Sequence, residues 1–165
     1  MGTDIDSTAV ESAKKIINSN RTLKDKIEIR LQDNRKHIFR GIIKKNEFFD
    51  ISICNPPFHK SEKEAQLGSQ RKLQNLNSKE NNILNFSGQK NELWCTGGEK
   101  MFIKNMIKES KNFASSCQWF TSLVSKKEHL NSFYDLLKKV SATQVKTIDM
   151  AQGNKKSRIL AWSFM

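Results

Sequence analysis

The stretch "FDISICNPPFHK", residues 49–60, holds the most strand-like run of the sequence and both of its prolines. Residues 49–54 form an apolar run that leads into the prolines, as a buried β-strand does. Pro56 and Pro57 lack an N–H for a sheet ladder and favour an extended backbone at the residue before each of them. The stretch predicts a buried strand that ends in a stiff corner, at the carboxyl edge of a sheet where α/β proteins bind ligands.

This corner offers two neighbouring hydrogen-bond acceptors, the amide oxygen of Asn55 and the carbonyl oxygen of Pro56, beside the ring of Phe58. They suit a planar base with an exocyclic amine, because the acceptors can bind both N–H hydrogens while the ring stacks on the heterocycle. An adenine N6 is a weak nucleophile, since its lone pair is delocalised into the ring. Preorganised acceptors would localise that lone pair toward a methyl donor. The structural alternative is a strand terminator with a capped turn.

Outward from the corner, strand-like and helix-like segments alternate along the chain. Such alternation predicts an α/β fold with a mainly parallel sheet covered by helices. The last two strands are joined by too short a turn for a crossover, so we expect an antiparallel C-terminal hairpin. The expected strands are residues 1–6, 27–31, 49–54, 117–124, 145–150 and 158–165, and the expected helices are residues 7–20, 98–110 and 129–140.

Two helices carry more specific expectations. Ser7 is the expected N-cap of the first helix, ahead of an apolar face at helical spacing. Residues 98–110 place their apolar side chains on what we expect to be the buried side of a second helix. These side chains are Met101, Phe102, Ile103, Met106 and Ile107.

The length of 165 residues predicts a single domain spanning residues 1–165. Residues 61–94 are rich in Lys, Asn, Gln and Ser and lack sustained periodicity. A polar segment of that length is a long loop or insertion, of a kind that is usually functional or disordered.

The charge balance favours a polyanionic partner. Lys and Arg number 29 against 17 Asp and Glu, which gives a formal net charge of +12. This field favours nucleic acid over a membrane surface, because no basic amphipathic anchor stands out; a solvated lysine-rich surface is the alternative. The three separated cysteines form neither a zinc pattern nor a disulfide framework. No membrane span or signal peptide is present in the sequence, so we expect a cytoplasmic protein without a metal.

Basic side chains cluster after the corner and on the turn between the last two strands. If both segments flank the site, they would contact nucleic-acid phosphates and position the strand without reading its bases. Each cluster taken alone is more often a solvated surface. The candidate residues for binding nucleic acid, which is RNA if the resemblance described next holds, are Lys60, Lys63, Arg71, Lys72, Lys155, Lys156 and Arg158.

The motif Asn-Pro-Pro-Phe resembles the amino-methylating motif of class I S-adenosylmethionine-dependent methyltransferases. With "ELWCTGGE", "WFTSLVS" and "MAQGNKKSRILAWSFM", the sequence resembles the ribosomal RNA large subunit methyltransferase F family over essentially its whole length. The resemblance implies a Rossmann-like fold, S-adenosylmethionine as donor, and N6-methylation of one adenine in 23S rRNA, either naked or in a ribosomal particle. Asn55, Pro56, Pro57 and Phe58 would form the catalytic and base-stacking motif.

The same resemblance implies donor-binding residues. The position that matches the family's ribose-binding acid, at the end of the second strand of such folds, is Asp4. Asp6 is better explained as an acid that favours the start of the helix. The contact with the donor's adenine should lie within residues 32–36, where Asp33 is the candidate, and Asn55 is assigned to the donor site as well as to the catalytic motif.

The first strand and the glycine-rich loop of the family pattern are missing from this sequence, and in such folds that strand lies in the middle of the sheet. Gly97-Gly98 lacks the spacing of a phosphate-binding fingerprint and predicts a tight turn into a helix. Two alternatives therefore stay open. One is a non-catalytic RNA-binding module derived from a methyltransferase, and the other is an amino-methyltransferase acting on DNA adenine or protein glutamine.

Overall fold

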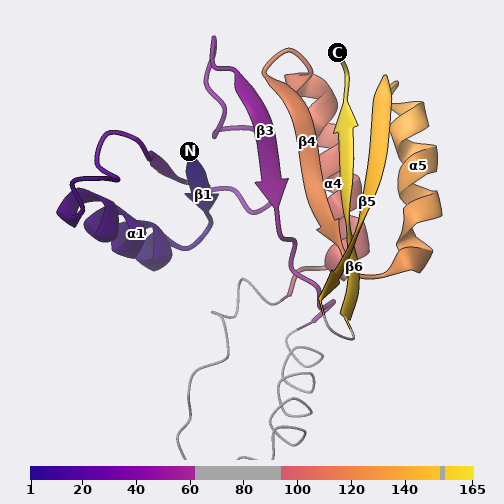
Figure 1. Cartoon of the computed structure of the whole chain (residues 1–165), viewed down its shortest axis with the longest axis horizontal. Coiled ribbons are helices and arrows are strands. Elements are labelled where there is room, and N and C mark those ends of the chain that lie inside the picture. Colours follow the sequence, from indigo (N-terminus) through magenta and orange to yellow (C-terminus); the bar gives the residue numbers. More distant parts are fainter. Residues whose placement is uncertain (62–93, 153–154) are drawn as a thin grey trace, which may run out of the picture. The chain divides into compact units, whose positions relative to one another are not determined.

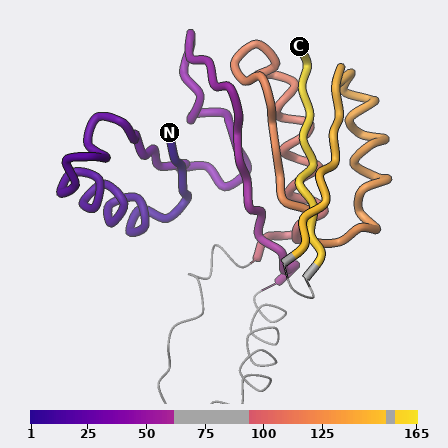
Figure 2. The backbone as a smooth tube through the Cα atoms, viewed as in Figure 1, coloured from indigo at the N-terminus to yellow at the C-terminus, as the bar shows by residue number. Residues whose placement is uncertain are grey.

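The computed structural model describes residues 1–61, 94–152 and 155–165. These residues form two compact units, Met1–Glu47 and Phe48–Met165, whose backbone paths can be followed in Figure 1 and Figure 2. Most of the loop expected at residues 61–94 lies outside the described residues. No helix formed by the described residues combines the length and apolar character that crossing a membrane requires. The single domain stays a prediction.

The first unit contains a two-stranded parallel sheet and one helix. Strand β1 (Gly2–Asp4) lies beside β2 (Ile29–Leu31). Helix α1 (Ser7–Ser19) connects the strands and buries Val10 and Ile17. The predicted strand–helix–strand order is confirmed, although β2 is shorter than the predicted strand.

The N-cap of α1 is Asp6, so the expectation that Ser7 caps this helix is wrong. Asp6 has an extended backbone, with φ −95° and ψ 114°, and its carboxylate accepts a hydrogen bond of 2.8 Å from the Thr8 N–H. Aspartate caps a helix as well as serine does and adds negative charge at the positive end of the helix dipole. The helix therefore begins at Ser7, directly after its cap.

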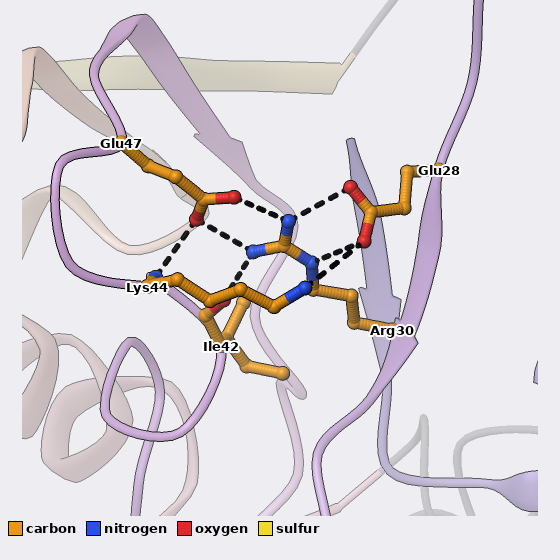
Figure 3. Close-up of polar contacts among 5 residues, drawn as sticks. All are labelled: Glu28, Arg30, Ile42, Lys44 and Glu47. Atoms are coloured by element: carbon orange, nitrogen blue, oxygen red, sulfur yellow. Dashed lines mark hydrogen bonds and ion pairs between the residues drawn. The ribbon is translucent and has the colours of Figure 1, made fainter. Parts of the chain in front are cut away.

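Arg30 of β2 forms hydrogen bonds with the irregular segment that follows this strand, residues 32–47, and holds it against the small sheet (Figure 3). Its guanidinium donates to both carboxylate oxygens of Glu47, at 2.5 and 2.7 Å, and to the Ile42 carbonyl oxygen at 2.5 Å. Glu28 accepts two further hydrogen bonds, at 2.7 and 2.8 Å. The hydrogen bond from Arg30 lowers the pKa of the Glu47 carboxyl to about 2. This charged cluster fixes the irregular segment that contains Ile42 and Glu47 relative to β2.

The second unit is a four-stranded sheet in the order β3-β4-β6-β5. Strands β3 and β4 are parallel, whereas β6 is antiparallel to both β4 and β5. The predicted C-terminal hairpin is confirmed, but the sheet is mixed rather than mainly parallel, because β6 lies between β4 and β5. Its elements are β3 (Phe49–Cys54), α4 (Gly98–Ser110), β4 (Cys117–Val124), α5 (Leu130–Lys139), β5 (Gln144–Gln152) and β6 (Lys155–Ser163), with short 3₁₀ helices at Lys111–Phe113 and Lys127–His129.

The core of this unit lies between the two helices and one face of the sheet. Phe120 and Trp162 are opposite each other on β4 and β6, and both are fully buried. The Trp162 indole N–H donates to the hydroxyl of Ser110 at the end of α4, at 2.9 Å, which satisfies a polar group inside the core. The helices contribute the fully buried side chains Ile103, Met106, Ile107, Phe133 and Leu137.

Two expectations about burial are wrong. Met101 is 47% exposed, because α4 turns a different face toward the core. Strand β3 is not buried, since Ile51 and Ile53 are 53% and 83% exposed. Their neighbour Ser52 is in register with Phe120, so the isoleucines point away from the face that α4 and α5 cover.

We predict that Glu47→Gln lowers the urea midpoint of unfolding at neutral pH. The lowered pKa of Glu47 means that its ionised form stabilises the folded state above the unfolded-state pKa, and that this contribution is lost as the pH falls from about 4.5 toward about 2. The difference between wild type and variant should therefore shrink over that pH range. Urea titrations at several pH values test this.

Glu11→Gln is the matched control, because Glu11 is exposed on α1. A Glu47→Gln midpoint equal to that of the control at neutral pH would contradict a stabilising role for the Arg30 cluster.

Candidate active site

The predicted corner follows β3 in the second unit and combines a buried anchor with exposed polar and aromatic groups. Pro56 is fully buried, whereas Asn55 is exposed and Phe58 is 36% exposed. The Asn55 side chain makes no hydrogen bond with a described residue. The buried proline fixes the backbone, so the positions of the Asn55 amide and the Phe58 ring are set before a ligand binds. Both groups are accessible to a ligand because they are exposed.

The turn that begins α4 packs directly on the corner. The Cys95 N–H donates to the His59 carbonyl oxygen at 3.1 Å. Gly97 and Gly98 have φ values of +82° and +62°, which confirms a tight turn that favours glycine. A Cβ on Gly98 would lie 3.2 Å from the Phe58 carbonyl oxygen and 3.3 Å from the His59 carbonyl carbon. Gly98 thus allows the turn to approach the corner closely.

Glu99, the next residue in this turn, links it to the segment after β4. Glu99 is only 2% exposed, and its carboxylate accepts hydrogen bonds from the Ser125 N–H, at 3.1 Å, and from the Ser125 hydroxyl. The His129 ring nitrogen Nδ1 lies 3.1 Å from the other carboxylate oxygen. Glu99 is not among the residues predicted from the sequence, because an acid in the first turn of a helix is ordinarily explained by the helix dipole.

The donor-site candidates lie in the first unit. Asp4 ends β1, and one of its carboxylate oxygens accepts a hydrogen bond of 2.8 Å from the Asp6 N–H. The Gln32 N–H donates to the Asp4 carbonyl oxygen at 2.7 Å, which places Asp33 directly after the strand end beside Asp4. Asp33 is exposed, whereas Gln32 is buried and accepts from the Asn34 N–H at 3.1 Å. The structure therefore brings Asp4 and Asp33 to the same edge of the small sheet.

Basic residues gather at the sheet edge of the second unit where the corner lies. Parallel strands β3 and β4 end at this edge, and antiparallel β6 begins there, so Lys155 and Lys156 lie at the same edge as Asn55 and Lys60. Lys60 and Lys156 are exposed. Contact between these residues and RNA stays a prediction. The other candidates after the corner, Lys63, Arg71 and Lys72, lie outside the described residues.

Arg158 differs from these lysines in being buried, with 9% of its surface exposed. Its Nε lies 3.5 Å from a carboxylate oxygen of Asp149 on the neighbouring strand. Its terminal nitrogen Nη1 is buried and has no hydrogen-bond partner among the described residues. A buried donor without a partner is unusual and marks a place where a ligand could bind.

The cysteines of the second unit are weakly reactive. Burial raises the pKa of the Cys54 thiol, next to the corner, to about 11, and it also raises the pKa values of Cys95 and Cys117. The thiolate is the nucleophilic form of cysteine, so burial disfavours that form at all three positions. Within the described ranges, no three His, Cys, Asp or Glu side chains come together as a metal site.

Comparison with known proteins finds relatives along the whole chain. A family described as RNA methyltransferase matches residues 1–165. Over 179 aligned residues the chain is 53% identical to the ribosomal RNA large subunit methyltransferase F of Shewanella woodyi, with 100% of this chain and 47% of that protein covered. The chain spans about half the length of the curated relatives it matches.

Solved structures share the fold. The human Mettl16 catalytic domain in complex with the MAT2A 3′UTR hairpin 1 has a TM-score of 0.72 at 23% identity, covering 99% of this chain and 54% of that one. The N-terminal domain of human METTL16 in complex with SAH has a TM-score of 0.68 at 22% identity, covering 99% of this chain and 51% of that one. The expected Rossmann-like methyltransferase fold is therefore confirmed.

We predict that Glu99→Gln lowers the free energy of unfolding by about 2 kcal/mol, the usual size of a hydrogen bond to a charged group. The NH₂ group of glutamine cannot accept a hydrogen bond, so one of the groups that now contact the carboxylate would lose its acceptor. Urea denaturation measures the change, with the exposed neighbour Glu128→Gln as the control of equal charge. Equal stabilities of the two variants would show that the Glu99 contacts contribute nothing to folding.

Proposed function

This chain belongs to the RNA methyltransferase family, and on that premise we propose that it is the catalytic part of an S-adenosylmethionine-dependent enzyme that methylates N6 of an adenine in 23S rRNA. The observation that carries the proposal is the corner Asn55–Phe58. It presents an exposed amide with no intramolecular partner among the described residues, on a backbone anchored by a buried proline.

The corner orients the base that is to be methylated. The Asn55 amide oxygen and the Pro56 carbonyl oxygen accept the two N6 hydrogens, and the Phe58 ring stacks on the adenine. Holding the hydrogens in this way directs the N6 lone pair away from the ring. The buried Pro56 fixes the backbone that carries these acceptors, so little reorganisation would be needed during transfer. When bound, the donor supplies an electrophilic methyl group on its sulfonium sulfur.

In the first unit, Asp4 and Asp33 would hold that donor. One Asp4 oxygen is occupied by the Asp6 N–H, and the structure gives the other no partner among the described residues. A free carboxylate oxygen at the end of a parallel strand suits the ribose hydroxyls of a nucleoside. The complex of a fold relative with SAH supports a donor of this chemical class.

RNA is the acceptor that the observations favour. The relatives are named ribosomal RNA large subunit methyltransferases, a fold relative was crystallised with an RNA hairpin, and the formal net charge of +12 favours a polyanion. Either naked 23S rRNA or a ribosomal particle would be the substrate, and the protein would act in the cytoplasm, where that RNA is. Comparing methyl transfer to rRNA, duplex DNA and glutamine-containing peptides separates this proposal from the other amino-methyltransferase activities.

We predict that Asn55→Ala lowers kcat for methyl transfer to rRNA on the order of 10²–10³-fold, as removal of one preorganised polar group does in other enzymes. Thermal unfolding should change little, because Asn55 is exposed. Transfer of labelled methyl groups measures the rate, with Asn105→Ala on the exposed side of α4 as the control. Near-normal turnover by Asn55→Ala would remove the mechanism.

Calorimetric titration with S-adenosylmethionine tests the donor site. We predict that Asp4→Asn weakens donor binding about tenfold, which corresponds to roughly 1.4 kcal/mol. Asparagine keeps an acceptor for the Asp6 N–H but removes the charge that the ribose hydroxyls contact.

Asp135→Asn, exposed on α5, is the matched control for this titration. Unchanged affinity in Asp4→Asn would rule out the assignment of Asp4. RNA binding by a folded wild-type chain that binds no donor would instead favour the non-catalytic RNA-binding module.

A further inference from the structure

The segment directly after β4, residues 125–127, lies next to the corner in the second unit; we call it the β4 loop. Strands β3 and β4 are parallel neighbours, with Cys54 opposite Ser122, and Figure 1 shows that both strands point to the same edge of the sheet. The corner begins one residue after Cys54, and the β4 loop begins after Val124. The two segments therefore leave adjacent strands at the same edge.

Glu99 fixes the β4 loop relative to the corner. Its carboxylate accepts from the N–H and the hydroxyl of Ser125, and the Lys126 N–H lies 3.5 Å from its other oxygen. The turn that contains Glu99 packs on the corner through Gly98. A single short turn thus holds both segments, so the backbone of the β4 loop has a defined position beside the base-binding residues.

The side chains of the β4 loop are cationic and available. Lys126 and Lys127 are exposed, and neither forms an ion pair with a described residue. Arg158 is in register with Val124, the last residue of β4, and its buried Nη1 has no hydrogen-bond partner in the described part of the chain. Glu128, an exposed acid, follows the two lysines. Two exposed lysines without an ion-pair partner among the described residues therefore follow the end of β4, and Arg158, whose Nε lies 3.5 Å from Asp149, is in register with its last residue.

We propose that the β4 loop is a phosphate-binding element of the RNA site, with Lys126 and Lys127 contacting the backbone of the strand that carries the target adenine. The inference rests on the proposed function and adds a binding element to it. Lysine ammonium groups act as point charges toward phosphate oxygens and carry no base specificity. Phosphate contacts beside the corner would hold the strand while the target base is splayed out onto Phe58.

The double variant Lys126→Gln/Lys127→Gln tests the proposal in the full chain. Binding of a short labelled single-stranded RNA containing adenines is measured over a range of KCl concentrations. Each lost phosphate contact should reduce the slope of log affinity against log salt by about 0.7. S-adenosylmethionine binding should not change. An unaltered salt slope would overturn the proposal.

The matched control is Lys138→Gln/Lys139→Gln, which removes the same charge from exposed positions in the last turn of α5. These lysines lie toward the opposite edge of the sheet, because α5 runs back from the end of β4 to the start of β5. The control should leave the slope unchanged. An equal reduction in both variants would show a nonspecific charge effect and would also overturn the proposal.

Glu99→Gln tests whether Glu99 affects RNA binding by positioning Lys126 and Lys127. In the wild-type background it should reduce the salt slope, and in the Lys126→Gln/Lys127→Gln background it should have no further effect. Equal reductions in both backgrounds would show that Glu99 acts only on folding. Failure of the proposed methyl transfer can be distinguished from failure of this proposal. The salt slopes of RNA binding can be measured even for a chain that transfers no methyl group.

Discussion

A buried carboxylate must satisfy its oxygens with hydrogen-bond donors, since an unpaired charge in a protein interior is very costly. Glu99 meets this requirement with Ser125 and His129, which belong to the segment after β4. Because Glu99 also belongs to the turn packed on the corner, satisfying one carboxylate fixes the loops that leave two adjacent strands. The relative position of these two loops therefore depends on the contacts of Glu99.

In the proposed function, the corner and the lysines around it have two different physical tasks. Asn55, Pro56 and Phe58 would supply short-range recognition of a flat polar base, which requires a rigid backbone and exposed groups. The lysines around them would supply long-range attraction that tolerates mobile side chains, because charge attraction to a polyanion needs little precise geometry. A mixed sheet serves both tasks, since parallel and antiparallel neighbours bring strand ends and a hairpin turn to one edge.

Features governed by neighbouring residues were predicted well. The two prolines, the strand before them and the glycine turn before α4 are encoded within a few positions, and the structure has each where the sequence indicated. The wrong predictions concern positions where two residues could play the same role, or where packing between elements decides which side chains are buried. Asp6 and not Ser7 caps α1, because both residue types can cap a helix and the two are adjacent. Met101 and the isoleucines of β3 are exposed because apolar character alone does not specify which face a neighbouring element covers.

The sequence by itself determined the chemistry of the corner, because the residue types of Asn55–Phe58 restrict backbone and hydrogen bonding locally. It also determined the cationic character of the chain. Only the tertiary structure decided that β6 lies between β4 and β5, and that Glu99 holds partners 26 and 30 residues away. Contacts between residues so distant along the chain leave no local pattern, because they arise when packing brings separate elements together around a charge that must be satisfied.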